Sequence, residues 1–325
     1  MRKRWFGFAA AVLVGAMAVV MGDAVGQGQV GGAPGRIAPG RGLAARVENR
    51  TYEFADTHEK LPYAVFVSSK VTKDKKAPLI IALHGLGGNS NTLLRGNALQ
   101  LAEEGGYILV GPMGYNSSGW YGMPIPNIGR ARGPAPAANS GTTQPASQPA
   151  RPAFRGFGAA GGTETDQTKV REYSEKDVLN VLEMIRKEYN VDDRRTYLMG
   201  HSMGGAGTLW LGEKHPSNWA AIAAIAPAAF SMQPNSIAKI KDMPVMIVQG
   251  DADTLVPPQG SRRWAEKMKE LKMDYEYNEI AGADHGTVIS RGMEDVFKFF
   301  AKHVKPEAES TSQPATQPTT ALETK

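Results

Sequence analysis

The chain carries a serine, an aspartate and a histidine in an order and setting that can break an ester or amide bond. Ser202 lies within the sequence Gly-His-Ser-Met-Gly-Gly at 200–205, between a strand-like run at 196–199 and a helical stretch that reaches Glu213. A strand, tight turn and helix around G-x-S-x-G is the arrangement that presents a nucleophilic serine. The glycines fit this interpretation because a side chain beside so strained a turn would collide with its neighbours. We therefore predict Ser202 as the nucleophile.

A serine hydroxyl is a weak nucleophile and needs a base that a carboxylate orients. In this setting the partners follow the serine in the order acid, then histidine. His285 follows a strand-like run at the same predicted sheet edge as Ser202, and we predict it as the base. Asp251 and Asp253 share the preceding loop, and Asp284 adjoins His285, so three acids are available. We favour Asp253, and expect Asp251 to bind backbone amides of its own loop.

A tetrahedral intermediate also needs backbone N–H donors aimed at its oxygen. The sequence His-Gly-Leu-Gly-Gly at 84–88 follows the strand-like run 78–83, two strands before the nucleophile. Glycines allow such a backbone to approach a ligand closely. We predict the amides of Leu86 and Met203 as the oxyanion donors.

Further side chains at this edge are candidates for substrate contact. His84 is the first residue of the oxyanion loop, residues 84–88, and His201 precedes the nucleophile. Tyr115, Trp120 and Tyr121 follow the strand-like run at 107–110. The aromatic residues could stack on an aromatic acyl group or a sugar ring. Packing of their loop onto the core explains them equally well, so both interpretations stay open.

The elements expected to position these residues alternate between strands and helices. A helix is predicted from Ser174, with Asp177 as its capping partner and an apolar face that reaches Tyr189. Two more helices are predicted at 264–271 and 293–304. The strand-like runs, several of them apolar throughout, are 62–67, 78–83, 107–110, 196–199, 220–226, 244–248 and 275–280. Alternation of this kind predicts an α/β domain with one doubly wound, mostly parallel sheet and helices on both faces.

At this point the chain resembles a known group of enzymes. The motifs at 84–88 and 200–205, Gly-Asp-Ala-Asp-Thr-Leu-Val-Pro at 250–257 and Gly-Ala-Asp-His-Gly at 282–286 look like those of secreted esterases related to polyhydroxybutyrate depolymerases and to feruloyl or acetylxylan esterases. They are also similar to phospholipase/carboxylesterase and prolyl-oligopeptidase-type domains. The resemblance covers about residues 47–305 and implies the α/β-hydrolase fold. In the group's pattern Gly-x-x-Asp-x-x-Val-Pro, the acid matches Asp253.

The remaining segments are predicted to flank or interrupt this domain. Residues 1–26 are predicted to be a signal peptide, with basic residues before an apolar run and small residues at the end. Residues 27–46 are expected to be a linker, 128–164 a low-complexity insert and 306–325 a tail, because their Gly, Ala, Pro, Ser and Gln content buries little apolar surface. The insert departs from the related esterases. We expect a periplasmic or secreted protein without a stable membrane anchor once the signal is removed.

Composition narrows the function further. The chain has no cysteine, which excludes disulfides, thiol catalysis and thiolate metal sites. Its formal charge is +5, but acidic and basic residues are interspersed, so no nucleic-acid partner is expected. No metal-ligand spacing or phosphate loop occurs, and the predicted chemistry needs no cofactor.

We expect an exported serine hydrolase that cleaves carboxylic esters in small molecules or polymers through an acyl-enzyme. Two alternatives remain: a prolyl-oligopeptidase-like serine peptidase, and a catalytically silent binding protein on the same scaffold. The second is disfavoured because the full set of catalytic residues is present. The natural substrate and the oligomeric state stay open.

Overall fold

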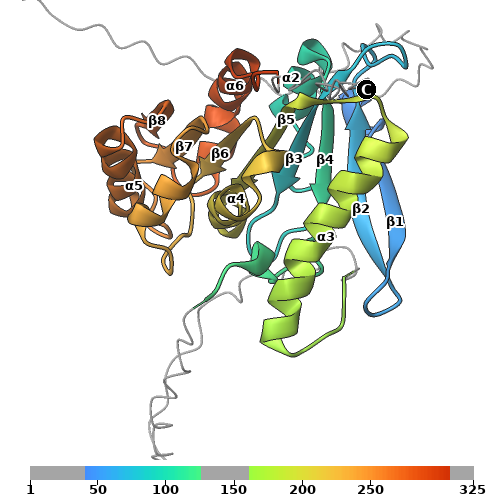
Figure 1. Ribbon diagram of the computed structural model, residues 1–325, viewed down its shortest axis with the longest axis horizontal. Helices are drawn as coiled ribbons and strands as arrows, with labels where there is room; N and C mark the ends of the chain where they lie inside the picture. Colours follow the sequence, from blue (N-terminus) through green and yellow to red (C-terminus); the bar gives the residue numbers. More distant parts are fainter. Residues whose placement is uncertain (1–40, 126–160, 308–325) are drawn as a thin grey trace, which may run out of the picture. The chain divides into compact units, whose positions relative to one another are not determined.

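The computed structural model describes residues 41–125 and 161–307 (Figure 1). The predicted signal peptide, most of the predicted linker and tail, and residues 128–160 of the predicted insert lie outside the described residues. Residues 41–46, assigned to the linker from sequence, include the short helix α1 (Arg41–Ala44). Within the described ranges, no helix is both long enough and apolar enough to cross a membrane.

One eight-stranded sheet organises the described residues, in the order β1-β2-β4-β3-β5-β6-β7-β8. Its strands are β1 (Glu48–Phe54), β2 (Glu59–Val67), β3 (Ala77–Leu83), β4 (Ile108–Pro112), β5 (Val191–His201), β6 (Ala221–Ile225), β7 (Val245–Gly250) and β8 (Tyr275–Ile280). The pairs β1–β2 and β2–β4 are antiparallel, and every other neighbouring pair is parallel. The predicted doubly wound, mostly parallel sheet is confirmed.

The central strands are the apolar runs that the sequence indicated. Every residue of β3, β4, β6 and β7 is buried, because helices cover both faces of the sheet. The edge strand β8 is half-buried throughout, and the opposite edge strand β1 is largely exposed. β1 was not predicted, since it lacks the apolar run by which the other strands were found.

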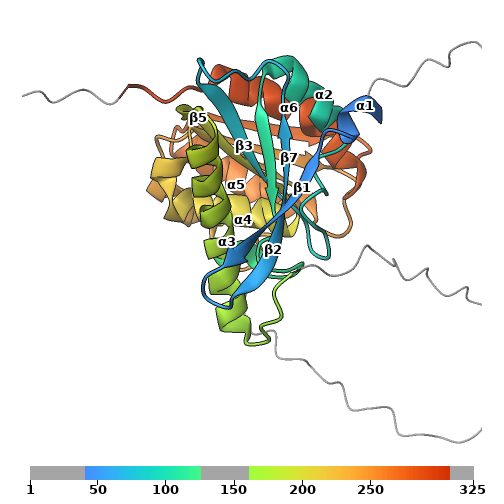
Figure 2. The same cartoon turned by 90° about the vertical axis from the view of Figure 1, so that its right-hand side faces the viewer.

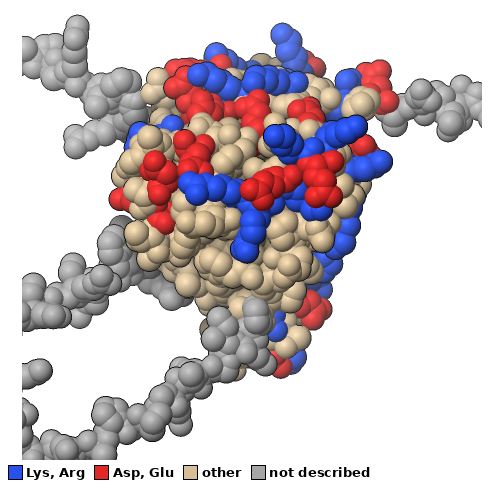
Figure 3. All heavy atoms as spheres, turned by 90° about the vertical axis from the view of Figure 1, so that its left-hand side faces the viewer, with Lys and Arg blue, Asp and Glu red and all other residues tan. Residues whose placement is uncertain are grey.

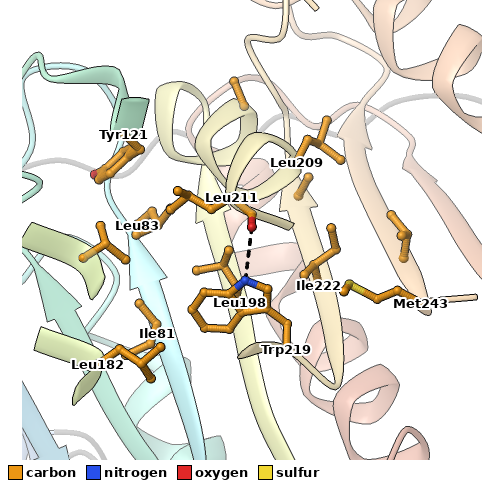
Figure 4. Close-up of a cluster of buried hydrophobic side chains, with 14 of the residues drawn as sticks. Ile81, Leu83, Tyr121, Leu182, Leu198, Leu209, Leu211, Trp219, Ile222 and Met243 are labelled. Carbon is orange, nitrogen blue, oxygen red and sulfur yellow. Dashed lines mark hydrogen bonds between the residues drawn. The ribbon is translucent and has the colours of Figure 1, made fainter. Parts of the chain in front are cut away.

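Helices lie on both faces of the sheet, as Figures 1 and 2 show. One face packs against α3 (Gln167–Glu188), α4 (Met203–Lys214) and α5 (Pro258–Glu270), and the other against α2 (Asn97–Gly105) and α6 (Thr287–Lys302). Figure 4 shows part of the first layer, where the indole N–H of Trp219 donates to the Leu211 carbonyl oxygen at 3.3 Å. Its apolar neighbours include Leu198, Ile222 and Met243. These two layers hold the sheet rigidly enough to position loops at its edge.

The start of α3 differs from the prediction. The helix begins at Gln167, and its N-cap is Asp166, whose carboxylate accepts the N–H groups of Thr168 and Lys169. Ser174 and Asp177, expected to be a capping pair, lie fully buried inside the helix. The other two predicted helices exist but begin six residues earlier, as α5 and α6, and α2 was not predicted.

Charge on the described surface is mixed in sign on the face that Figure 3 presents. Lysine and arginine alternate with aspartate and glutamate over its upper part, and its lower part is largely uncharged (Figure 3). That face carries no large patch of a single sign of charge.

Candidate active site

The turn between β5 and α4 holds Ser202 in a strained conformation. Its φ of 58° and ψ of −115° lie outside the regions that non-glycine residues favour. A Cβ added at Gly200 would lie 2.2 Å from the Gly204 carbonyl oxygen, and one added at Gly204 would lie 2.2 Å from the Leu83 carbonyl oxygen. Both obstructing atoms belong to the backbone, so neither can move aside. The two glycines therefore allow the turn that exposes the serine at the strand's carboxyl end.

The structure brings Ser202, His285 and Asp253 together in one hydrogen-bonded chain. The Ser202 hydroxyl lies 2.9 Å from His285 Nε2, and His285 Nδ1 lies 2.7 Å from Asp253 Oδ2. With the Nδ1 proton donated to the carboxylate, Nε2 is left to accept the serine proton. The Asp253 side chain is fully buried, whereas that of His285 is partly exposed. The arrangement can generate a nucleophile at a position that solvent and substrate can reach.

Of the three acids considered, only Asp253 contacts the His285 ring. Its Oδ1 accepts the amides of Leu255 and Val256 at 2.9 Å each, which fixes the carboxylate toward the histidine. Asp251 instead accepts the amide of Gly282, in the next loop.

Asp284 accepts the amides of Gly286 and Thr287 at the start of α6. These hydrogen bonds lower the pKa of Asp284, the Thr287 amide being the first cause. Its carboxylate caps the helix and does not orient the histidine.

The two backbone amides predicted as oxyanion donors, those of Leu86 and Met203, belong to residues that line the cavity with Ser202. In the oxyanion loop, the Gly87 amide donates to Ser117 and the Gly88 amide donates to Gly85, which leaves the Leu86 amide. Met203 is the first residue of α4, where backbone N–H groups have no partner within the helix. Neither amide has a hydrogen-bond acceptor among the described residues.

The two neighbouring histidines fix loops. His84 is buried, and its two ring nitrogens each lie 2.8 Å from a backbone oxygen, of Gly85 and of Met113. Burial lowers the pKa of His84, so the neutral ring donates one of these bonds. His84 does not line the cavity. His201 Nε2 lies 2.8 Å from the His285 carbonyl oxygen, and burial, followed by the charge of His285, lowers its pKa to about 4. Neutral His201 therefore donates to the loop that carries the base.

A cavity of about 520 Å³ opens over Ser202 and has an apolar rim. Three large apolar side chains on it are unusually exposed: Leu86 at 61%, Phe230 at 68% and Leu255 at 71%. Trp120, a candidate for substrate contact, also lines the cavity. Tyr121 and Tyr115 are fully buried and do not line it.

Sequence reasoning missed Phe230, Leu255 and Arg95 as cavity residues. For Leu255 a signal existed, since it follows Asp253 within the same motif. Phe230 and Arg95 carry no motif, and only the fold places them beside Ser202. No group of three or more His, Asp or Glu side chains that could hold a metal occurs in residues 41–125 and 161–307.

Two family models match parts of the sequence. The model described as "Serine aminopeptidase, S33" matches residues 153–243, which include Ser202. The model described as "Prolyl oligopeptidase family" matches residues 228–307, which include Asp253 and His285. No curated protein sequence matches the chain significantly.

The solved structures similar to this one include esterases and other hydrolases. A thermostable esterase has a TM-score of 0.55 and 21% identity, covering 81% of this chain and 64% of that one, so this chain spans less than two thirds of its length. A ferulic acid esterase from Anaeromyces mucronatus, in complex with ferulic acid, has a TM-score of 0.56 and 18% identity, covering 79% of this chain and 90% of that one. An S-formylglutathione hydrolase from Agrobacterium tumefaciens has a TM-score of 0.53 and 17% identity, covering 79% of this chain and 95% of that one.

The sheet order, the serine turn and these likenesses define an α/β-hydrolase fold, and the resemblance to that superfamily is confirmed. The similar structures named above are two esterases and an S-formylglutathione hydrolase, and the two matching family models describe peptidases.

Proposed function

We propose that this chain is a serine hydrolase that cleaves carboxylic esters through an acyl-enzyme intermediate. The observation that carries the proposal is the chain of hydrogen bonds from Ser202 through His285 to Asp253. Ser202 and His285 line a cavity with an apolar rim. Leu86 and Met203 line that cavity, and we propose their backbone amides as the donors that stabilise the tetrahedral intermediate.

The reaction follows from the positions of these groups. Ser202 Oγ attacks the ester carbonyl while His285 Nε2 takes the hydroxyl proton, and the Leu86 and Met203 amides bind the oxygen that becomes negative. His285 then gives its proton to the leaving alcohol, and the acyl group stays on Ser202. Water attacks the acyl-enzyme with His285 again as base, which releases the acid and the free serine. Asp253 stabilises the imidazolium in both halves.

Esters are favoured over peptides by the likeness to the ferulic acid esterase, which covers 79% of this chain and 90% of that one. Peptide cleavage is the second candidate, supported by the two peptidase family models and by chemistry that the same triad can perform. A silent binding protein is disfavoured because an assembled triad would serve no purpose in it.

We also propose that residues 1–26 direct export to the periplasm or the exterior, on the strength of their basic start and apolar run alone. A small-molecule or polymer-linked ester is the expected partner, without nucleic acid.

The test is hydrolysis of 4-nitrophenyl esters from acetate to octanoate, of methyl ferulate and of a peptide anilide, by the wild type and by Ser202→Ala. We expect ester turnover that the variant loses by several orders of magnitude, because the nucleophile acts only as part of its triad. Turnover of the anilide alone would favour the peptidase. Equal rates for the two proteins would refute the triad and favour the binding protein.

A further inference from the structure

The loop that carries Trp120 to the cavity is strained. This tryptophan loop, residues 113–123, follows β4 and includes the short 3-10 helix η1 (Trp120–Gly122). Tyr115, Trp120 and Tyr121 have φ values of 64°, 55° and 52°, in the left-handed region that non-glycine residues rarely adopt. Strain of this kind persists only where surrounding contacts enforce it, and it gathers at functional sites. The backbone amides of this loop are held by two side chains of α3.

Asp177 of α3 holds the first part of the tryptophan loop. Its Oδ2 accepts the amides of Gly114 at 2.6 Å and Tyr115 at 3.1 Å. Its Oδ1 accepts the hydroxyl of Tyr52 at 2.6 Å. The carboxylate is fully buried, and every bond to it comes from a neutral donor. A buried carboxylate is costly, so its position against two loop amides indicates that the loop conformation depends on it.

Ser174, one turn before Asp177, holds the second part. Its hydroxyl oxygen accepts the Tyr121 amide at 3.0 Å, and the Tyr121 hydroxyl donates to the His84 carbonyl oxygen at 3.0 Å. The Tyr121 ring lies so close to Gly114 and Gly207 that a Cβ added there would come within 2.5 Å and 2.6 Å of it. Figure 4 shows this ring in the buried cluster near Leu83, the last residue of β3 before the oxyanion loop. Tyr121 therefore joins α3, the tryptophan loop and the oxyanion loop.

Trp120 is the residue that these contacts leave facing the site. Its neighbour Tyr121 is immobilised on both sides, through its amide and its hydroxyl, whereas Trp120 is half-buried and lines the cavity with Ser202. With Tyr121 fixed in a left-handed conformation, the direction of the Trp120 side chain is restricted as well. The hydrogen bonds that Ser174 and Asp177 of α3 make to this loop therefore determine where Trp120 lies at the cavity.

We propose that Ser174 and Asp177 are positioning residues that hold Trp120 as a wall of the substrate cavity, and so set how well a large acyl group is accepted at Ser202. This inference rests on the proposed function. It assigns to α3 a part in substrate selection, although neither side chain touches the substrate.

The test compares Ser174→Ala with a matched control, Ser68→Ala. Ser68 is also a buried serine whose hydroxyl oxygen accepts a backbone amide, that of Lys70 at 3.2 Å, but it lies outside the cavity lining. For each full-length protein, kcat and KM are measured with 4-nitrophenyl acetate and octanoate, together with the melting temperature. We expect Ser174→Ala to lower the octanoate-to-acetate ratio of kcat/KM about tenfold, mainly through the KM for octanoate, because an unpaired Tyr121 amide releases the loop. Ser68→Ala should leave that ratio unchanged.

A second pair of variants shows whether the effect acts through Trp120. If it does, Trp120→Ala should lower the same ratio, and Ser174→Ala added to it should lower the ratio no further. An unchanged ratio in Ser174→Ala, an equal fall in Ser68→Ala, or additive effects in the double variant would each overturn the inference.

Reaction with ethyl and octyl fluorophosphonates separates this inference from the proposed function, because it requires only a reactive Ser202. The wild type should react with both reagents, and Ser174→Ala should lose rate selectively with the octyl compound. A reactive wild type with no such selectivity overturns the α3 inference alone. Absence of any reaction that depends on Ser202, with esters and phosphonates alike, overturns the proposed function and this inference with it.

Discussion

The cavity over Ser202 has two sides that are built by different means. On the triad side, Asp253 is fixed by the amides of Leu255 and Val256, two and three residues further along the chain. On the Trp120 side, the loop is fixed by Ser174 and Asp177, which lie more than fifty residues from the amides they bind. Local bonds thus hold the acid of the triad, and distant buried bonds hold the loop that carries Trp120. The difference predicts that the first side governs rate and the second governs selectivity.

The largest effect is expected from the triad side. Asp253→Asn keeps the shape of the acid but favours the wrong His285 tautomer, so kcat should fall by about 10⁴-fold for every ester, whatever its size. Steady-state kinetics over the 4-nitrophenyl series measure this. Asp251→Asn, in the same loop but bound to Gly282, is the matched control and should change kcat by less than about tenfold. A similar loss in both variants would mean that the loop, and not the acid, is responsible.

The same contrast explains what the sequence could predict. Ser202, Asp253 and His285 are identifiable because parallel strands end at one edge, so side chains just after β5, β7 and β8 must meet there. The central strands could be predicted as well, because each is a continuous apolar run that is buried on both faces of the sheet. The roles of Ser174 and Asp177 could not be found this way. A serine followed three residues later by an acid is typical of a capping box, and only tertiary burial shows that both bind another loop.

His84, Tyr121 and Phe230 illustrate the remaining limits. The first two lie within or next to motifs, which suggested substrate contact, but packing turns His84 and Tyr121 inward. Phe230 lies on the cavity rim because of how the segment after β6 is folded, and its surrounding sequence has no pattern that marks it. Motifs therefore located the chemistry, but not which neighbouring side chains face the solvent.

An intermediate effect is expected on stability, through Asp177. Burial, the largest influence, raises the pKa of this carboxyl from 3.8 to about 6, against the three hydrogen bonds that lower it. A folded-state pKa above the unfolded value means that the group's favourable contribution is complete below pH 3.8 and is lost as pH rises through 6. A shift of about two units corresponds to about 3 kcal/mol at neutral pH.

Asp177→Asn removes this titration while its amide oxygen can still accept the loop amides. The free energy of unfolding of the variant, minus that of the wild type, should therefore increase by about 2 kcal/mol between pH 4 and pH 7. Denaturant unfolding of both proteins at each pH gives the difference, which cancels the other titrating groups. A difference that stays constant with pH would show that the three hydrogen bonds to Asp177 offset the effect of burial on its pKa. A difference that decreases as pH rises would show that the pKa of Asp177 is lowered by folding.

The smallest effect is expected at the rim, where selectivity should change without stability. Phe230 is 68% exposed, so Phe230→Ala removes little packing and should leave the melting temperature unchanged. A long acyl chain that covers about 40 Å² of this ring would lose about 1 kcal/mol of binding, roughly a fivefold fall in kcat/KM for octanoate, with acetate unaffected. Ser174→Ala should change selectivity and melting temperature together, because its bond is buried. Equal losses for acetate and octanoate in Phe230→Ala would place the acyl chain elsewhere and leave Trp120 as its contact.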